Sequence, residues 1–292
     1  MLLTEKYVNP FTDFGFKNLF GSEPNKDLLI NFLNQVLPPH HQIEDLSYKR
    51  GEYSGYSASD RKAVFDLYCV SSTGEHFVVE MQKAKQNFFK DRSVFYATFP
   101  IQEQAKRGPW DFRLSAVYMV GILDFVFDED KSEQSVRHEV QLKDQDCRVF
   151  YDKLTFIYLE MPNFTKTEEE LDTMYDKWLY VLKHLPDLDR RPEKLQERVF
   201  EKLFEAAAIA KLTPAEKDQY EDSLKHFRDL KNVIDTSFEE GKEEGKMEGR
   251  EEGKMGGIVK SLKRGKLTLE EIAEDFEVSV DFITKIKGEQ GL

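Results

Sequence analysis

The stretch that decides the fold runs from Asp66 to Gln82 and reads DLYCVSSTGEHFVVEMQ. Two runs rich in β-branched and aromatic residues, 62–70 and 76–82, flank a Ser-Ser-Thr-Gly segment of the kind that reverses a chain. This pattern predicts a β-hairpin whose midpoint, Thr73, falls inside the turn.

Alternation of side chains along the two strands predicts which residues share a face of the hairpin. On the first strand, one face is expected to carry Val64, Asp66 and Tyr68, and the other Phe65, Leu67 and Cys69. On the second strand, one face is expected to carry Val78, Glu80 and Gln82, and the other Phe77, Val79 and Met81. Asp66 and Glu80 are placed symmetrically about Thr73, so a regular hairpin sets them directly opposite, with Cβ atoms roughly 4.5 to 5.5 Å apart.

Two carboxylates that face each other repel, so this pair requires a compensating partner. A hard divalent cation is the simplest one, because Mg²⁺ takes one or two carboxylates and completes its shell with waters and substrate phosphates. The alternative is a solvated strand face that happens to carry two acids. The hairpin geometry alone leaves both interpretations open.

The hairpin follows an amino-terminal segment, residues 9–21, that reads NPFTDFGFKNLFG. This segment, followed by an Asp on one strand and Glu-x-Gln on the next, resembles the Rpn family of recombination-promoting nucleases and transposases, a branch of the PD-(D/E)XK nuclease superfamily. The resemblance covers roughly residues 7–162. It implies an α/β fold with a restriction-endonuclease-like α-β-β-β-α-β core that hydrolyses DNA phosphodiester bonds with Mg²⁺ or Mn²⁺.

The resemblance also implies the metal ligands, which are Asp66, Glu80 and the backbone carbonyl of Met81. Gln82 stands where most of the superfamily has a lysine. A neutral amide donates and accepts hydrogen bonds but lacks the charge with which a lysine offsets developing negative charge. We therefore take Asp66, Glu80 and Gln82 as the candidate catalytic residues. Lys83 points to the opposite face of a regular strand and is a poor local replacement.

The amino-terminal segment supplies two supporting candidates. Lys17 is a distant substitute for the missing lysine. Asp13 is a candidate to support the metal ligands or to bind a second metal. The alternative is that it caps a short helix, a role that Thr12 can also fill.

The segment after Gln82 supplies two more supporting candidates, Arg92 and Tyr96. A helix is expected over about 87–106, and Arg92 and Tyr96 share one of its faces because they are four residues apart. Arg92 is suited to stabilise phosphate charge, with Tyr96 stacking or hydrogen-bonding beside it. The alternative is an arginine that lies over a core aromatic ring.

Composition bounds the class of protein. The chain has 292 residues, of which 40% are apolar, enough for one ordinary core and an appended module. Residues 1–110 hold 13 Lys and Arg against 13 Asp and Glu, so the rest (29 against 42) carries the whole net charge of -13. A neutral amino-terminal part is compatible with DNA as a partner. No apolar run approaches the ~18 residues of a membrane span, so we expect no membrane contact and a cytoplasmic location.

Four parts are expected along the chain. Residues 1–162 form the nuclease-like core, in which a helix begins after Asn25 and further strands cover 43–53, 112–123 and 154–161. Residues 163–236 change to a period of 3.6 and form a helical region. Residues 237–257 contain the repeat, and residues 258–292 form a small helical hairpin that resembles a helix-turn-helix.

The repeat places glycine at every fourth position, at 241, 245, 249, 253 and 257. Either it is a helix with a glycine stripe that associates with a second copy into a homodimer, or it is a flexible charged linker. The tail has few basic residues, so packing is the simpler interpretation of its hairpin.

The function predicted from these features is a divalent-metal-dependent DNA endonuclease linked to recombination or mobile elements. The alternative is a non-catalytic nucleic-acid-binding or assembly protein on a degenerate nuclease fold, with Gln82 as the sign of the lost chemistry.

Overall fold

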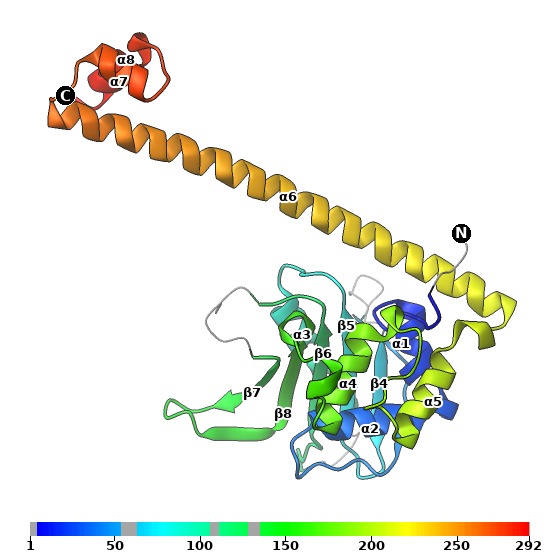
Figure 1. The fold of residues 1–292 in the computed structure, drawn as a ribbon. Coiled ribbons are helices and arrows are strands. Elements are labelled where there is room, and N and C mark those ends of the chain that lie inside the picture. Colours follow the sequence, from blue (N-terminus) through cyan, green and yellow to red (C-terminus); the bar gives the residue numbers. More distant parts are fainter. Residues whose placement is uncertain (1–4, 54–62, 106–110, 128–134, 292) are drawn as a thin grey trace. The chain divides into compact units, whose positions relative to one another are not determined.

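The hairpin expected at 66–82 consists of β4 (Leu67–Ser71) and β5 (His76–Gln82), which pair antiparallel with Leu67 opposite Val79. The computed structural model describes residues 5–53, 63–105, 111–127 and 135–291 (Figure 1). The chain divides into two compact units, residues 1–230 and 231–292.

A six-stranded mixed sheet forms the centre of the first unit, in the order β1-β4-β5-β6-β8-β7 across the described residues. β5, β6 and β8 run parallel, and the other neighbouring pairs are antiparallel. The remaining strands of this sheet are β1 (Leu46–Tyr48), β6 (Val117–Leu123), β7 (Arg137–Lys143) and β8 (Val149–Glu160). Two short strands, β2 (Glu52–Tyr53) and β3 (Ala63–Val64), pair separately.

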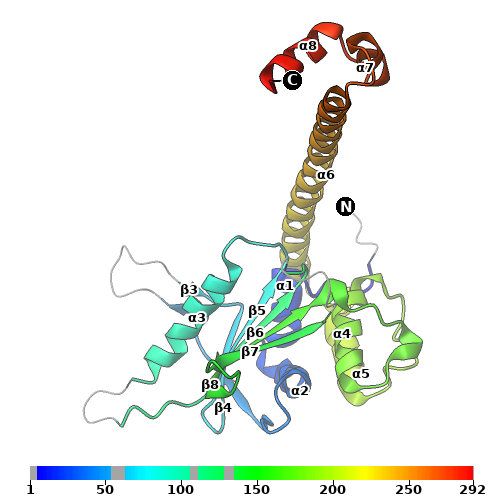
Figure 2. The same ribbon diagram turned by 90° about the vertical axis from the view of Figure 1, so that its left-hand side faces the viewer.

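Helices cover both faces of the sheet, as Figure 2 shows. One face packs against α1 (Asp13–Phe20), α2 (Lys26–Val36), α4 (Met174–His184) and α5 (Arg198–Ala207). The other face packs against α3 (Phe89–Glu103). Short 3₁₀ turns lie at Glu23–Asn25, Met161–Asn163, Glu168–Glu170, Leu185–Asp187 and Ile209–Lys211.

The expected α-β-β-β-α-β order is present as α2, β1, β4, β5, α3 and β6. The fold is therefore a restriction-endonuclease-like α/β core, as predicted. The helices of 163–236 share one hydrophobic cluster with α1 and α2, since the buried side chains of Trp178 and Phe200 pack with Phe20 and Phe32. The boundaries at 162, 236 and 257 remain a proposed division of the sequence.

The single strand expected over 62–70 is interrupted, which corrects one prediction; its first residue lies outside the described part of the chain. Phe65 and Asp66 stand between β3 and β4, and the Phe65 N–H donates to the carbonyl of Gly51 at 2.7 Å. Phe65 is buried with Tyr68 and α3 instead of sharing the face of Leu67. The faces of β5 agree with the expected alternation, because Val78 packs toward α3 while Phe77, Val79 and Met81 pack toward α1 and α2.

Other element bounds differ in detail from the expectation. The strand predicted over 43–53 is two short strands, β1 and β2, that belong to different sheets. The predicted helix over 87–106 is α3, which ends at Glu103. The edge strand β7 was not predicted.

The second unit contains α6 from residue 231 to its end, α7 (Leu269–Asp275) and α8 (Val280–Glu289). α6 as a whole spans Pro214–Arg264, so the glycine repeat is helical in this structure. Ile258 of α6 packs with Ile272 of α7 and with Ile283 and Ile286 of α8 in a small core. The predicted helical hairpin at 258–292 is therefore present. None of the described helices is both long and apolar enough to cross a lipid bilayer.

Candidate active site

Asp66 and Glu80 lie opposite each other at the open end of the hairpin, because the β4–β5 register, continued one step beyond Leu67 and Val79, pairs them. The Asp66 N–H donates to Glu80 Oε1 at 3.1 Å, and the Met81 N–H donates to Asp66 Oδ2 at 2.7 Å. Each carboxylate is thus held by the backbone of the other strand. The two acids come together as the hairpin symmetry predicts.

Both acids are costly to ionise where they lie. Glu80 is only 2% exposed, and burial raises the pKa of its carboxyl group, with the nearby Asp66 charge raising it further. Burial likewise raises the pKa of Asp66, although the Met81 N–H opposes this. The pair therefore favours a positive partner, because cations stabilise the charged form of both groups.

Arg92 of α3 supplies one positive partner. Its Nη2 lies 3.0 Å from Glu80 Oε2 and 3.3 Å from Gln82 Oε1, and its Nη1 lies 2.6 Å from Gln86 Oε1. Its Nε is buried and has no hydrogen-bond partner among the described residues. The guanidinium group is therefore directed at the acid pair, and its buried Nε–H is left without an acceptor among the described residues.

Tyr96 lies one helical turn further along α3. The guanidinium carbon of Arg92 is 5.1 Å from the centre of the Tyr96 ring, within the range of a cation–π contact. Burial raises the pKa of the Tyr96 hydroxyl, so the group is neutral near pH 7. Arg92 thus lies over an aromatic ring, as the alternative expects, and it also reaches Glu80.

Gln82 is buried, and both ends of its amide are engaged. Its Oε1 accepts from Arg92, and its Nε2 donates to the carbonyl of Ala84 at 3.1 Å. The amide is therefore fixed, and Oε1 keeps a second lone pair for another donor.

Asp13 and Lys17 belong to α1, whose cap settles one open question. Thr12 is the N-cap residue, with Oγ1 accepting from the Gly15 N–H at 3.0 Å. Asp13 instead forms an i, i+4 ion pair with Lys17 at 2.9 Å. Both charges act on Asp66, since Asp13 raises the pKa of that carboxyl group and Lys17 lowers it.

Lys83, which a regular strand directs to the face opposite Gln82, is a further cation near the acids. Its Nζ lies 5.9 Å from the centre of the Phe227 ring, on the side of the sheet away from Gln82, as alternation predicts. Burial lowers the pKa of Lys83, while the charges of Asp13 and Asp66 oppose that change. The sequence indicates a role for Lys83 only through its position directly after Gln82, where β5 ends, because this position lies at the edge of the site.

The donor set fits a small hard cation. No three His, Cys, Asp or Glu side chains converge in the part of the chain that the structure describes. Mg²⁺ does not need three, because one or two carboxylates suffice when waters and phosphates complete its shell. An ionised carboxylate offers about four lone-pair positions, and Glu80 uses one on Asp66 and one on Arg92. The carboxylates of Asp66 and Glu80 thus retain capacity for an ion.

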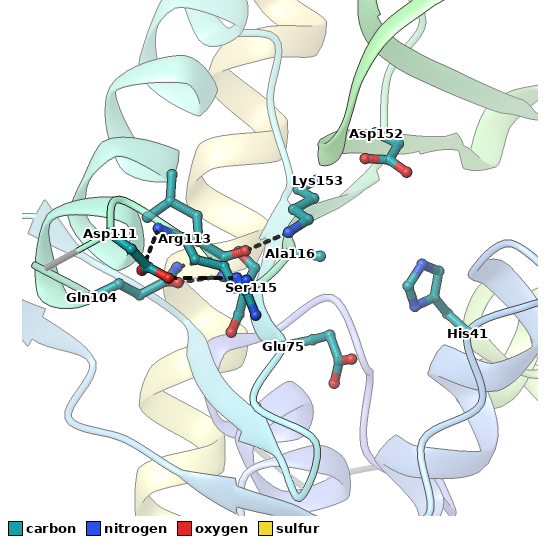
Figure 3. Close-up of a pocket in the computed structure, with 10 residues that line it drawn as sticks. His41, Glu75, Gln104, Asp111, Arg113, Ser115, Ala116, Asp152 and Lys153 are labelled. Atoms are coloured by element: carbon teal, nitrogen blue, oxygen red, sulfur yellow. Dashed lines mark hydrogen bonds and ion pairs between the residues drawn. The ribbon is translucent and has the colours of Figure 1, made fainter.

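A hollow of about 590 Å³ lies at the amino ends of β5 and β6, at the end of the strands opposite the acid pair (Figure 3). His41, Glu75, Asp152 and Lys153 surround it. Lys153 donates to the carbonyl of Leu114 at 2.9 Å and so supports the chain that leads into β6. Because the acid pair lies at the carboxyl end of β5, this hollow is a separate feature.

Comparison with protein families identifies the family of this chain. The model of the PD-(D/E)XK nuclease family transposases matches residues 10–237, which is most of the chain. The chain belongs to this family. No curated protein and no solved structure gives a significant match. Membership in the PD-(D/E)XK family agrees with the resemblance seen in the hairpin and the amino-terminal segment, and it supports a nuclease-like or transposase-related function.

Proposed function

We propose that this PD-(D/E)XK family member is a Mg²⁺- or Mn²⁺-dependent DNA endonuclease that hydrolyses phosphodiester bonds during recombination or the movement of a genetic element. One observation carries the proposal. Glu80 is buried, Asp66 lies half-buried opposite it, and the guanidinium group of Arg92 points at them. The proposal places the protein in the cytoplasm, with DNA as its partner.

Asp66, Glu80 and the Met81 carbonyl would hold the divalent ion, which lowers the pKa of a bound water and offsets charge on the scissile phosphate. Burial of Glu80 and partial burial of Asp66 limit competing water and strengthen the electrostatic interactions of the two carboxylates. Their backbone hydrogen bonds fix the spacing between them, so ligands need little reorganisation on binding.

The other residues act on the phosphate and the water. Arg92, whose side chain is partly exposed, binds a phosphate oxygen through its guanidinium group and neutralises charge as it builds up, with Tyr96 supporting the guanidinium plane. Gln82 orients the attacking water through the remaining lone pair of Oε1. Lys17, held by Asp13, and Lys83 supply positive charge from the α1 side of the acids.

The test is nicking of supercoiled plasmid with Mg²⁺ or Mn²⁺ by wild type, Asp66→Asn and Glu80→Gln. We expect metal-dependent nicking that both substitutions reduce by at least 100-fold, since each removes a charged metal ligand. Glu160→Gln is the matched control, because Glu160 is equally buried at the end of β8 but contacts Phe127 and Asn163 instead of the acid pair. Nicking that survives both substitutions contradicts the proposal.

A second candidate is a binding or assembly protein that has lost its chemistry, and Gln82 in place of lysine favours it. Melting curves separate the two. A catalytic site predicts a higher melting temperature in millimolar Mn²⁺ than in EDTA for the wild type and no difference for Asp66→Asn. Equal curves for both proteins favour the second candidate.

We also propose that the glycine repeat of α6 mediates a homodimer. Gly245 and Gly249 are helical, and a Cβ atom added at either one meets nothing within 4 Å among the described residues, so their surface is open to a second copy. Leucine at both positions keeps a helix former but blocks close approach. We expect the double variant to shift from dimer to monomer in sedimentation, and a monomeric wild type excludes the dimer.

A further inference from the structure

Phe88, directly before α3, combines two unfavourable features. Its backbone is left-handed, with φ 64° and ψ 28°, a conformation that bulky side chains rarely adopt because Cβ crowds the neighbouring carbonyl. Its ring is 78% exposed, so burial does not compensate for the strain. Residues held in strained conformations cluster at functional sites, which makes Phe88 a candidate contact.

The turn at Phe88 separates two neighbouring aromatic rings. Phe89 points into the core, where its ring centre lies 6.0 Å from that of Phe125 and 6.4 Å from that of Phe127. Phe88 points outward, while its carbonyl accepts the Arg92 N–H at 2.9 Å. The position of Phe88 is therefore tied to the helical turn that carries Arg92.

A pocket of about 320 Å³ opens beside Phe88, near the lower end of the roughly 300–1,000 Å³ typical of small-molecule sites. Phe125 and Phe127 form part of its aromatic wall, and two lysines against one aspartate give it a net positive charge. These charged residues are Lys85, Lys90 and Asp91. Aromatic walls combined with positive charge suit a nucleobase and its phosphate, because bases stack on aromatic rings while lysines follow the backbone.

The pocket adjoins the acid pair through one side chain. Gln86 lines the pocket and accepts a hydrogen bond from Arg92 Nη1, whose neighbour Nη2 contacts Glu80. A nucleotide in the pocket therefore touches Gln86, which is hydrogen-bonded to Arg92, and Arg92 is the residue that faces the scissile phosphate. Substrate held there is linked to the catalytic residues through Arg92.

We propose that Phe88 stacks against an unstacked base of the DNA strand next to the scissile phosphate, and that the adjoining pocket receives this base. The inference rests on the proposed nuclease function and names how that site engages its substrate. Lys85 and Lys90 contact the flanking phosphates. The unstacking cost is smallest where the duplex is already open or mismatched, so such DNA is the preferred substrate.

Phe88→Asn is the decisive variant. Asparagine tolerates the left-handed conformation, so the variant relieves strain and retains the fold while it removes the ring. Phe112→Asn is the matched control, since Phe112 is also 78% exposed and left-handed, with φ 59°. It lies between Asp111 and Arg113, which line the hollow at the amino ends of β5 and β6, away from the acid pair. Melting curves check that both variants fold.

The probe is a duplex oligonucleotide with 2-aminopurine near its cleavage position, bound in Ca²⁺ to slow cleavage. We expect wild type and Phe112→Asn to raise the fluorescence, which reports unstacking. Phe88→Asn abolishes the rise and weakens DNA binding by about 5- to 100-fold, the equivalent of one lost stacking contact.

The outcomes separate the two proposals. Wild type that nicks plasmid, combined with unchanged fluorescence and affinity for Phe88→Asn, overturns the base-stacking inference alone and indicates that the pocket takes a different ligand, such as an apolar side chain of a protein. Wild type that nicks but leaves the fluorescence unchanged also overturns it. Wild type that neither binds nor nicks DNA overturns the proposed function and this inference together.

Discussion

The backbone N–H of Asp66 donates to the Glu80 side chain, so a hydrogen bond links these two residues although the charges of their carboxylates repel. The bond fixes Glu80 Oε1 against the start of the opposite strand. Because Glu80 is buried and Asp66 half-buried, the protein holds the two carboxyl groups together at a cost in stability, which the positive charge of Arg92 reduces.

The first prediction is a pH-dependent gain in stability for Glu80→Gln in EDTA. The folded pKa of Glu80 lies above its ordinary value of 4.5, so the folded state binds more protons than the unfolded state above that pH. The free energy of unfolding of the wild type therefore falls as pH rises from about 4.5 through the raised pKa. Glutamine mimics the protonated acid, so the variant should match wild type at pH 4.5 and exceed it at pH 8 by about 1–3 kcal/mol, since one pKa unit is worth about 1.4 kcal/mol.

Thermal melting in EDTA at both pH values measures this difference. About 2–4 °C per kcal/mol is expected for a unit of this size. Glu160→Gln should gain no stability at pH 8, because Glu160 accepts hydrogen bonds from the Phe127 N–H and Asn163 that one amide oxygen replaces only in part. A Glu80→Gln protein that is less stable than wild type at pH 8 would show that the acid pair carries no electrostatic strain.

The second prediction concerns restoration of the superfamily lysine. Gln82 is 7% exposed and accepts a hydrogen bond from Arg92, so Gln82→Lys places an ammonium group against a guanidinium in a buried site. We expect a loss of about 1–3 kcal/mol in the free energy of unfolding and reduced nicking, not a gain.

The double variant Gln82→Lys, Arg92→Gln supplies the control. It removes the repulsion and leaves an amide opposite the lysine, so part of the lost stability should return, with a coupling of about 0.5–3 kcal/mol between the two positions. A single Gln82→Lys protein that is as stable as wild type and more active would show that the two positions do not interact.

How far the sequence predicts this site depends on the range of each interaction. The hairpin and the facing acids follow from local symmetry about Thr73, and the placement of Arg92 and Tyr96 on one helix face follows from their spacing. These features depend on neighbours in the chain, so period and turn chemistry are sufficient. The family resemblance then selects the fold.

The features that the sequence did not predict depend on distant partners. The break at Phe65 follows from its bond to Gly51 and from pairing of β3 with β2. The environment of Lys83 depends on Phe227, which belongs to a helix at the far end of the unit. β7 is an exposed, largely polar strand at the sheet edge, and it gave no apolar run to detect.

The third prediction separates the charges on the α1 side of the acids. Lys17→Met and Lys83→Met each remove one cation and keep most of the side-chain length. If each lysine contacts a phosphate, each variant reduces the slope of log affinity against log salt by about 0.9. Lys26→Met is the control, because Lys26 is likewise paired with an acid, Asp45 at 2.7 Å, but it belongs to α2 and its charge is not among those that shift the pKa of Asp66. Equal slopes for all three variants and wild type would remove Lys17 and Lys83 from the DNA contact.

The last prediction tests the packing of the second unit with two glycines of the same helix. A Cβ atom at Gly257 would lie 2.6 Å from Cε1 of Phe276, whereas a Cβ atom at Gly253 meets nothing within 4 Å among the described residues. Gly257→Ala therefore forces Phe276 out of the core formed with Ile258 and should cost about 1–3 kcal/mol. Gly253→Ala should stabilise α6 by about 1 kcal/mol, because alanine favours the helix over glycine.

Hydrogen exchange of the amides in α7 and α8 measures the effect, since these two helices form the small core with Ile258. Faster exchange is expected for Gly257→Ala, and exchange as in wild type or slower for Gly253→Ala. Gly256→Ala repeats the comparison at the next position, because its Cβ atom also meets nothing within 4 Å among the described residues. Equal protection in the Gly257 and Gly253 variants would mean that Phe276 does not pack against α6 in solution.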